Sequence, residues 1–138
     1  MIKLLKRQPG SVTIETAISF PVMMLLMLAI IQFGTLVYAR QSAEEAARYG
    51  VRMGVINVGN PVGGAVAAAS QYAASALPWG YQVEVEAPGG VVGTVLRLRV
   101  STTPPNLLGP IMNYFGGSSG GGYQISAIAE GRMEGWQP

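Results

Sequence analysis

Few side chains in this 138-residue sequence could carry out chemistry. It has no histidine and no cysteine, which excludes thiol chemistry, disulfides and metal sites built on nitrogen or sulfur ligands. Glu84 and Glu86 alternate along one predicted strand, and Arg97 and Arg99 alternate along the next. Because carboxylates and arginines on neighbouring strands pair with each other, we interpret these residues as solvated ion pairs and not as a general acid and base. We therefore expect neither an enzyme nor a bound cofactor, metal or small-molecule substrate.

Glu15 differs from the other acidic residues because it is the one charged residue between Arg7 and Arg40. The 24 residues from Thr16 to Ala39 carry no charge and would form a helix of roughly 36 Å at about 1.5 Å per residue. That length crosses a hydrocarbon core of about 30 Å with some tilt, so the sequence predicts a membrane-spanning segment at residues 16–39. A carboxylate at the edge of such a segment is a candidate functional group. The simpler interpretation is that Glu15 is solvated among lipid headgroups.

The predicted membrane helix contains a proline. Pro21 has no backbone donor, and its ring clashes with the carbonyl group of Ala17, so we expect a kink or local unwinding there. Thr16 and Ser19 could partly satisfy the carbonyl groups that the proline frees. Two interpretations stay open: a tolerated membrane proline, and a point where the helix bends or stretches during packing.

A short basic leader, residues 1–10, precedes the membrane segment. A cleaved secretory signal has an apolar core of roughly 7–15 residues, and the segment here is longer, so an uncleaved signal anchor is one interpretation. Equal numbers of basic residues flank the segment, and their count does not set its orientation. These residues are Lys3, Lys6, Arg7, Arg40, Arg48 and Arg52. The very short N-terminal tail favours an N-terminus in the cytoplasm, with the bulk of the chain outside it.

The order of basic leader, Gly10, Ser11, Glu15 and apolar helix resembles the processing site of type IV pilin-like proteins. This resemblance implies that a membrane aspartyl peptidase, the prepilin peptidase, cleaves between Gly10 and Ser11 on the cytoplasmic side. It also implies that Glu15 of one subunit neutralises the new α-amino group of Ser11 in a neighbour. Among apolar helices such a pair would fix the axial register, because an unpaired charge there is costly.

Beyond Arg40 the helix is predicted to continue, so that residues 11–56 form one long N-terminal helix. Small residues recur along it at helical spacing, including Ala43, Ala46, Ala47, Gly50 and Gly54. Such a stripe permits the close approach of another element. It packs either on the sheet of this chain or on a neighbouring subunit, and both interpretations stay open.

Residues 57–138 are predicted to form a small extracytoplasmic domain. A second helix is expected over Ala65–Leu77, after which the apolar period changes to two. Strands are expected near 81–86, 95–100 and 123–134, with a long apolar loop at 104–115 and a Gly/Ser linker at 116–122. The predicted fold class is therefore α+β, with a long N-terminal helix, a short second helix and an antiparallel three-stranded sheet.

Residues at the end of the membrane segment restrict the resemblance to one family of pilin-like proteins. They are Phe33, Gly34, Tyr38, Ala39 and Arg40. With the leader and the proline-bearing helix, they resemble the TadE-like pseudopilins of the tight-adherence (Tad, or Flp) pilus system. The sequence differs from the major pilins of that system, which carry tyrosine directly after the glutamate, where this chain has Thr16. This difference favours a minor pilin or pseudopilin. The related TadF and TadG proteins stay open as alternatives.

The resemblance implies a single-pass protein of the bacterial inner membrane that takes part in pilus assembly, either in the membrane or in the pilus. The implied partners are membrane lipid, the prepilin peptidase, other pilins or pseudopilins, and inner-membrane assembly proteins. Nucleic acid is not expected as a partner, because the net charge of +2 comes from the three basic residues of the leader. The alternative function is an uncleaved, membrane-anchored extracytoplasmic binding module.

Overall fold

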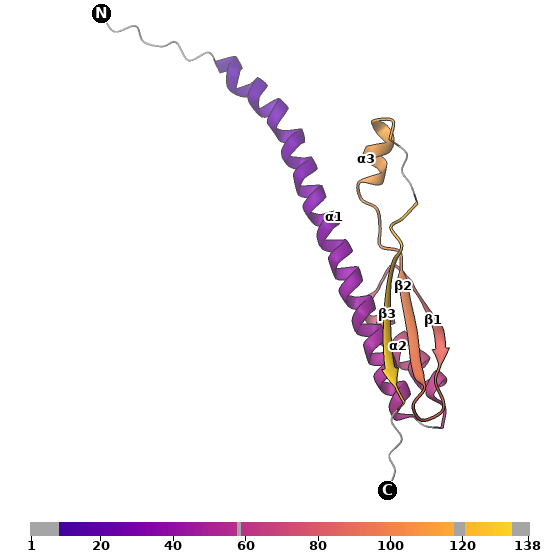
Figure 1. Cartoon of the computed structure of the whole chain (residues 1–138). Helices are drawn as coiled ribbons and strands as arrows, with labels where there is room; N and C mark the ends of the chain where they lie inside the picture. The colour runs from indigo at the N-terminus through magenta and orange to yellow at the C-terminus, as the bar shows by residue number, and fades with distance from the viewer. Residues whose placement is uncertain (1–8, 58, 118–120, 134–138) are drawn as a thin grey trace, which may run out of the picture.

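The computed structural model describes residues 9–57, 59–117 and 121–133, with side chains from residue 12 onward. The elements are two helices, α1 (Pro9–Ile56) and α2 (Pro61–Ala76), the strands β1 (Tyr81–Pro88) and β2 (Val95–Thr102), a short helix α3 (Gly109–Tyr114), and the strand β3 (Ile125–Arg132). Figure 1 shows the C-terminal half of α1 beside α2 and the sheet, while its N-terminal half projects beyond them. The predicted α+β class and the three-stranded antiparallel sheet are confirmed.

Helix α1 is one continuous helix of 48 residues. It includes Gly10 and Ser11 in its first turn and begins at Pro9, a position where proline is favoured because the first helical N–H needs no partner. The helix is not interrupted at Pro21, so the local unwinding expected there is absent. In Figure 1 the helix follows a shallow curve. Thr16 Oγ1 donates to the carbonyl oxygen of Val12 at 2.8 Å, and not to a carbonyl freed by the proline.

The sheet has the order β1-β2-β3, with β2 in the centre. Val100 of β2 lies opposite Val83 of β1 and Ala127 of β3. The alternation of side chains then directs Leu96, Leu98 and Val100 into the core, where they are fully buried. An irregularity at Glu86 shifts the register of β1 near its end. The predicted hairpin is confirmed.

Small residues let α1 and α2 approach each other closely. The core is formed by alanines on both helices and by aliphatic residues of β2, namely Ala43, Ala46, Ala47, Val51, Ala65, Ala69, Ala73, Leu96, Leu98 and Val100. A Cβ at Gly50 would lie 2.7 Å from Ala69 Cβ and 2.8 Å from the carbonyl oxygen of Ala65. The small-residue stripe therefore packs on α2 and the sheet of its own chain. The C-terminal half of α1 is thus part of the core of the folded domain, whereas the predicted domain began at residue 57.

Two other boundaries differ from the prediction. Helix α2 begins at Pro61 and not at Ala65, because Asn60 caps it by accepting a hydrogen bond from the N–H of Gly63 at 2.9 Å. The last strand begins at Ile125, and its predicted end at Glu134 lies outside the described residues. The predicted linker at 116–122 lies partly outside them as well.

The expected loop at 104–115 is wrong in one respect, because it contains the helix α3. Asn106 Oδ1 accepts a hydrogen bond from the N–H of Gly109 at 2.9 Å, just ahead of the first turn. Pro110 then occupies an early helical position, where its missing N–H costs little. Three prolines and a glycine in this stretch favour irregular structure, but the turn closed by Asn106 lets a short helix start at Gly109.

Candidate functional site

The N-terminal half of α1 exposes a large apolar surface. Its well exposed apolar side chains are Ile14, Ile18, Phe20, Val22, Met23, Met24, Leu26, Met27, Ile30 and Phe33. The helix is long and apolar enough to cross a membrane, and almost none of its most apolar stretch is buried by the rest of the chain. A core helix of a soluble protein would bury that stretch, so this surface needs lipid or another apolar partner to cover it.

Glu15 lies near the N-terminal end of this surface. Its side chain is exposed, and Val12, Ser19, Phe20 and Met23 surround a shallow hollow beside it. Among the described side chains, none forms an ion pair with Glu15. Ser11 is four residues earlier in the same helix, roughly 6 Å along the axis, and its side chain lies outside the description. The carboxylate is therefore open to a cationic group from another molecule.

Gln32 is a polar residue of the apolar segment that the sequence reasoning did not single out. It is only 4 % exposed. Its Oε1 accepts a hydrogen bond from the N–H of Leu107 at 2.7 Å, and its Nε2 donates to the carbonyl oxygen of Pro105 at 3.3 Å. A lone amide within an apolar segment is the signal that could have identified it, because such groups are costly unless they are paired. Gln32 attaches the loop before α3 to the apolar half of α1.

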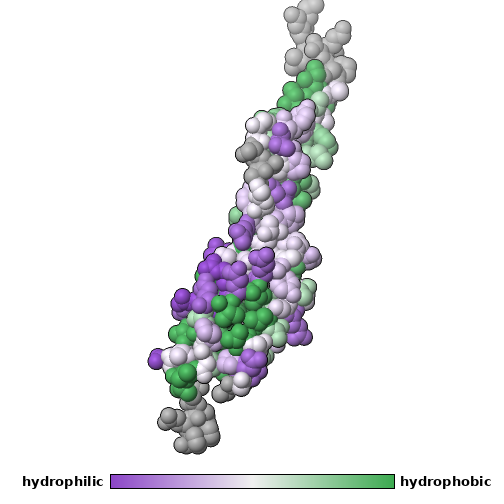
Figure 2. Space-filling view, turned by 90° about the vertical axis from the view of Figure 1, so that its right-hand side faces the viewer, coloured by the Kyte–Doolittle hydropathy of each residue, from purple (hydrophilic) through white to green (hydrophobic). Residues whose placement is uncertain are grey.

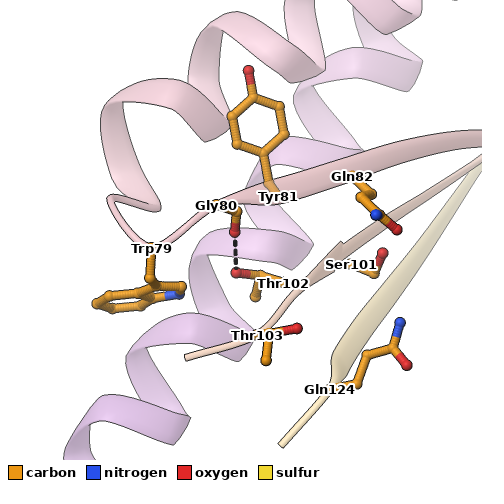
Figure 3. Close-up of a pocket in the computed structure, with 8 residues that line it drawn as sticks. All are labelled: Trp79, Gly80, Tyr81, Gln82, Ser101, Thr102, Thr103 and Gln124. Carbon is orange, nitrogen blue, oxygen red and sulfur yellow. Dashed lines mark hydrogen bonds between the residues drawn. The ribbon is translucent and has the colours of Figure 1, made fainter. Parts of the chain in front are cut away.

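Aromatic residues mark the junction between the apolar half of α1 and the folded domain. The rings of Tyr38 and Trp79 meet edge to face at 6.2 Å between their centroids. Trp79 also borders a hollow between the starts of β1 and β3 and the end of β2 (Figure 3). Thr102 Oγ1 donates to the carbonyl oxygen of Gly80 there at 2.6 Å. None of the eight lining residues is charged at neutral pH, so this hollow offers no acid–base pair.

A family model matches the N-terminal part of the chain. Residues 10–52 match the family model described as TadE-like protein. Most of helix α1 is therefore similar to TadE-like proteins. No match was found among the curated proteins or among the solved structures. The TadE-like match bears out the resemblance drawn from the sequence, and it indicates a protein associated with the Tad pilus.

The TadE-like segment, residues 10–52, joins the exposed apolar half of α1 to the core of the folded domain. It contains Glu15, Pro21 and Gln32 in the exposed apolar half, and it continues through the alanines of the core to Arg52. The second helix, the sheet and α3 lie outside the match. The TadE-like segment is therefore both the membrane-crossing candidate and one wall of the domain core.

Charged side chains gather at the opposite end of the molecule from Glu15. Figure 2 shows the densest hydrophilic surface over the lower half, beside a hydrophobic patch, whereas the upper part is mostly pale with scattered hydrophilic and hydrophobic residues. On the outer face of the sheet Arg99 pairs with Glu86, and Arg97 Nη2 pairs with Glu130 Oε2 at 2.7 Å. The hydrogen bond to Glu130 raises the pKa of Arg97 above its ordinary value. These exposed pairs agree with the interpretation of the strand charges as solvated ion pairs, with Glu130 as a partner that the sequence had not indicated.

Proposed function

We propose that this chain is a minor subunit of the pseudopilin type, which takes part in the assembly of a Tad/Flp pilus. The proposal rests on one observation: the TadE-like helix exposes an apolar half of membrane-spanning length and builds its other half into the domain core. An anchor joined by a loose linker could be exchanged for any apolar segment. Here the helix that would pack among other subunits also holds the domain, so its position determines the position of the domain.

In this proposal the prepilin peptidase cleaves between Gly10 and Ser11 on the cytoplasmic side of the inner membrane, and the domain lies in the periplasm. The new α-amino group of Ser11 is then the cation that Glu15 of a neighbouring subunit neutralises. The exposure of Glu15 and the absence of an ion pair among the described side chains support this role. In an apolar surrounding the attraction between the two groups is strong, and a shift of one helix by a turn would leave both unpaired.

The proposed partners follow from these surfaces. Lipid and the apolar helices of other pilins or pseudopilins cover the apolar half of α1, and inner-membrane assembly proteins meet it where it leaves the bilayer. The folded domain carries exposed ion pairs and lies in water. The chain stays in the membrane or enters the pilus through the same packing surface.

The deciding experiment is the intact mass and N-terminal residue of the protein purified from its native membrane. We expect a chain that begins at Ser11, and a chain that begins at Met1 when the same cells lack the prepilin peptidase. A chain that begins at Met1 in cells with active peptidase would contradict the proposal. That result would favour the uncleaved, membrane-anchored binding module.

A further inference from the structure

We infer that the segment Thr103–Gly117, which carries α3, enters the outer leaflet of the membrane that α1 crosses. We call this segment the α3 loop. The inference rests on the proposed membrane anchoring of α1 and adds a second contact with lipid. Figure 1 shows α3 beyond the end of the sheet, at the level of the apolar half of α1. A domain that simply stood on the membrane surface would not extend an element to this level.

The composition of the α3 loop suits lipid. The chain carries no charged residue from Val100 to Ala129, the region that contains the loop. The side chains of Tyr114 and Phe115 are 87 % and 76 % exposed, and Met112 is also well exposed. Large apolar and aromatic side chains that are exposed in this way gain free energy when lipid covers them, because their surface is removed from water.

The backbone of the α3 loop is prepared for an environment without water. Pro104, Pro105 and Pro110 have no N–H to satisfy. The N–H groups of Met112, Phe115, Gly116 and Gly117 all bond to carbonyl oxygens within the loop. Gly109 donates to Asn106, and Leu107 donates to Gln32. Irregular backbone is tolerated at membrane depth only where its polar groups find partners in the protein, and the loop meets much of that requirement.

Gln32 fixes the depth of the α3 loop. It lies seven residues before Ala39, the end of the uncharged segment, and so about 10 Å along the helix at about 1.5 Å per residue. With a hydrocarbon core of about 30 Å, that distance reaches into the outer third of the bilayer. The two hydrogen bonds from Gln32 hold Pro105 and Leu107 at this depth. Lipid is the favoured partner because α3 lies at the level of the exposed apolar half of α1, which the proposed function places in the bilayer (Figure 1).

The absence of cysteine allows a direct measurement of depth. Single cysteines replace Phe115 in the α3 loop, Ile30 in the apolar half of α1, and Val91 in the turn between β1 and β2. Ile30 and Val91 are matched controls because they are 72 % and 68 % exposed, close to Phe115. Each full-length variant is labelled with the fluorophore nitrobenzoxadiazole in detergent. It is then reconstituted in phosphatidylcholine–phosphatidylglycerol vesicles that contain nitroxide-labelled lipid, at two protein-to-lipid ratios.

We expect nitroxide lipid to quench the label at Phe115→Cys nearly as strongly as at Ile30→Cys. Quenching at Val91→Cys should be at least about twofold weaker, because that turn lies outside a hydrocarbon core of about 30 Å. A second variant, Tyr114→Cys, should behave as Phe115→Cys and guards against a local disturbance by one label. Equal quenching at both protein-to-lipid ratios is expected of a contact with lipid.

Three results would overturn the inference in different ways. If Ile30→Cys is quenched and Phe115→Cys is not, the loop lies in water while α1 still spans the membrane. If nitroxide lipid quenches Phe115→Cys less at the higher protein-to-lipid ratio while Ile30→Cys is unaffected, a neighbouring subunit covers the loop and lipid does not. If Ile30→Cys is not quenched either, membrane anchoring by α1 is itself wrong, and the proposed function falls with it.

Discussion

The side-chain amide of Gln32 binds the backbone of Leu107, which is 75 positions later in the chain, at 2.7 Å between Oε1 and N. A second bond joins Nε2 of the same side chain to Pro105 at 3.3 Å. These bonds attach the α3 loop to a helix whose surroundings at that level are otherwise apolar. One uncharged polar residue therefore connects the two uncharged segments of the sequence.

Replacement of Gln32 by leucine should release the α3 loop. The substitution leaves the N–H of Leu107 and the carbonyl group of Pro105 without partners, at a cost of about 1–3 kcal/mol for a group that stays buried. We expect faster amide hydrogen exchange from Leu107 to Phe115, measured by mass spectrometry in detergent micelles. Thr35→Val is the matched control, because the hydrogen bond of Thr35 among the described residues stays within α1, to Ile31. Unchanged exchange in the loop of Gln32→Leu would show that the loop is held by other contacts.

Gly50→Ala should destabilise the folded domain. The added Cβ would lie 2.7 Å from Ala69 Cβ and 2.8 Å from both Ala65 O and Leu98 Cδ2, so two helices or the sheet must move. Overpacking of this kind costs about 1–3 kcal/mol. The control is Gly34→Ala in the same helix, where a Cβ meets nothing within 4 Å and should be neutral or stabilising. Thermal unfolding in detergent, followed by circular dichroism, would contradict the prediction if both variants unfolded at the same temperature.

Tyr72 of α2 donates a hydrogen bond to Glu45 of α1, and this bond raises the pKa of the phenol above its ordinary value of 10.0. The phenol is therefore held in its neutral form in the folded state. Its contribution to stability is complete below pH 10 and is lost as the pH rises through the higher folded pKa, because the unfolded chain ionises first. Glu45→Gln should lower the pKa of Tyr72, measured by NMR of ring-labelled tyrosine. An unchanged value would assign the shift to another cause.

Glu15→Gln should block pilus assembly and leave membrane insertion intact. The substitution keeps the size and polarity of the side chain and removes the charge that the Ser11 amino group would need. We expect membrane fractions to retain the protein and electron microscopy to show few or no pili. Glu44→Gln is a control for charge alone, because Glu44 pairs with Arg40 outside the apolar segment. Normal piliation in Glu15→Gln cells would show that Glu15 does not set the register.

Much of the fold follows from periodic sequence patterns. The uncharged stretch from Thr16 to Ala39 predicted the exposed helix, and the alternation around Leu98 predicted the central strand. The match to the TadE-like family model ends at Arg52, near the end of that helix. The exposed helix and the central strand were predictable because each depends on residues that are close together in the sequence.

Features that depend on distant residues were not predicted. Whether the stripe at Ala43 and Ala47 packs inward or on another subunit is decided by the alanines of α2, which face it in the structure. Gln32 was passed over because its partners, Pro105 and Leu107, lie in a loop with no periodic pattern. Glu130 pairs with Arg97 because β3 returns beside β2, and the sequence does not state the order of the strands.

The continuity of α1 has a mechanical consequence. The same helix crosses from its exposed half into the core at Ala39 without a break, so tension applied at its membrane end reaches the domain directly. That tension acts along the helix, in the direction in which α1 lies against α2 and the sheet (Figure 1). Because the force is parallel to the interface, it loads all of these contacts at the same time. They must therefore break together and cannot be broken one after another. Such a subunit could be drawn out of a bilayer by its helix while its domain remained folded.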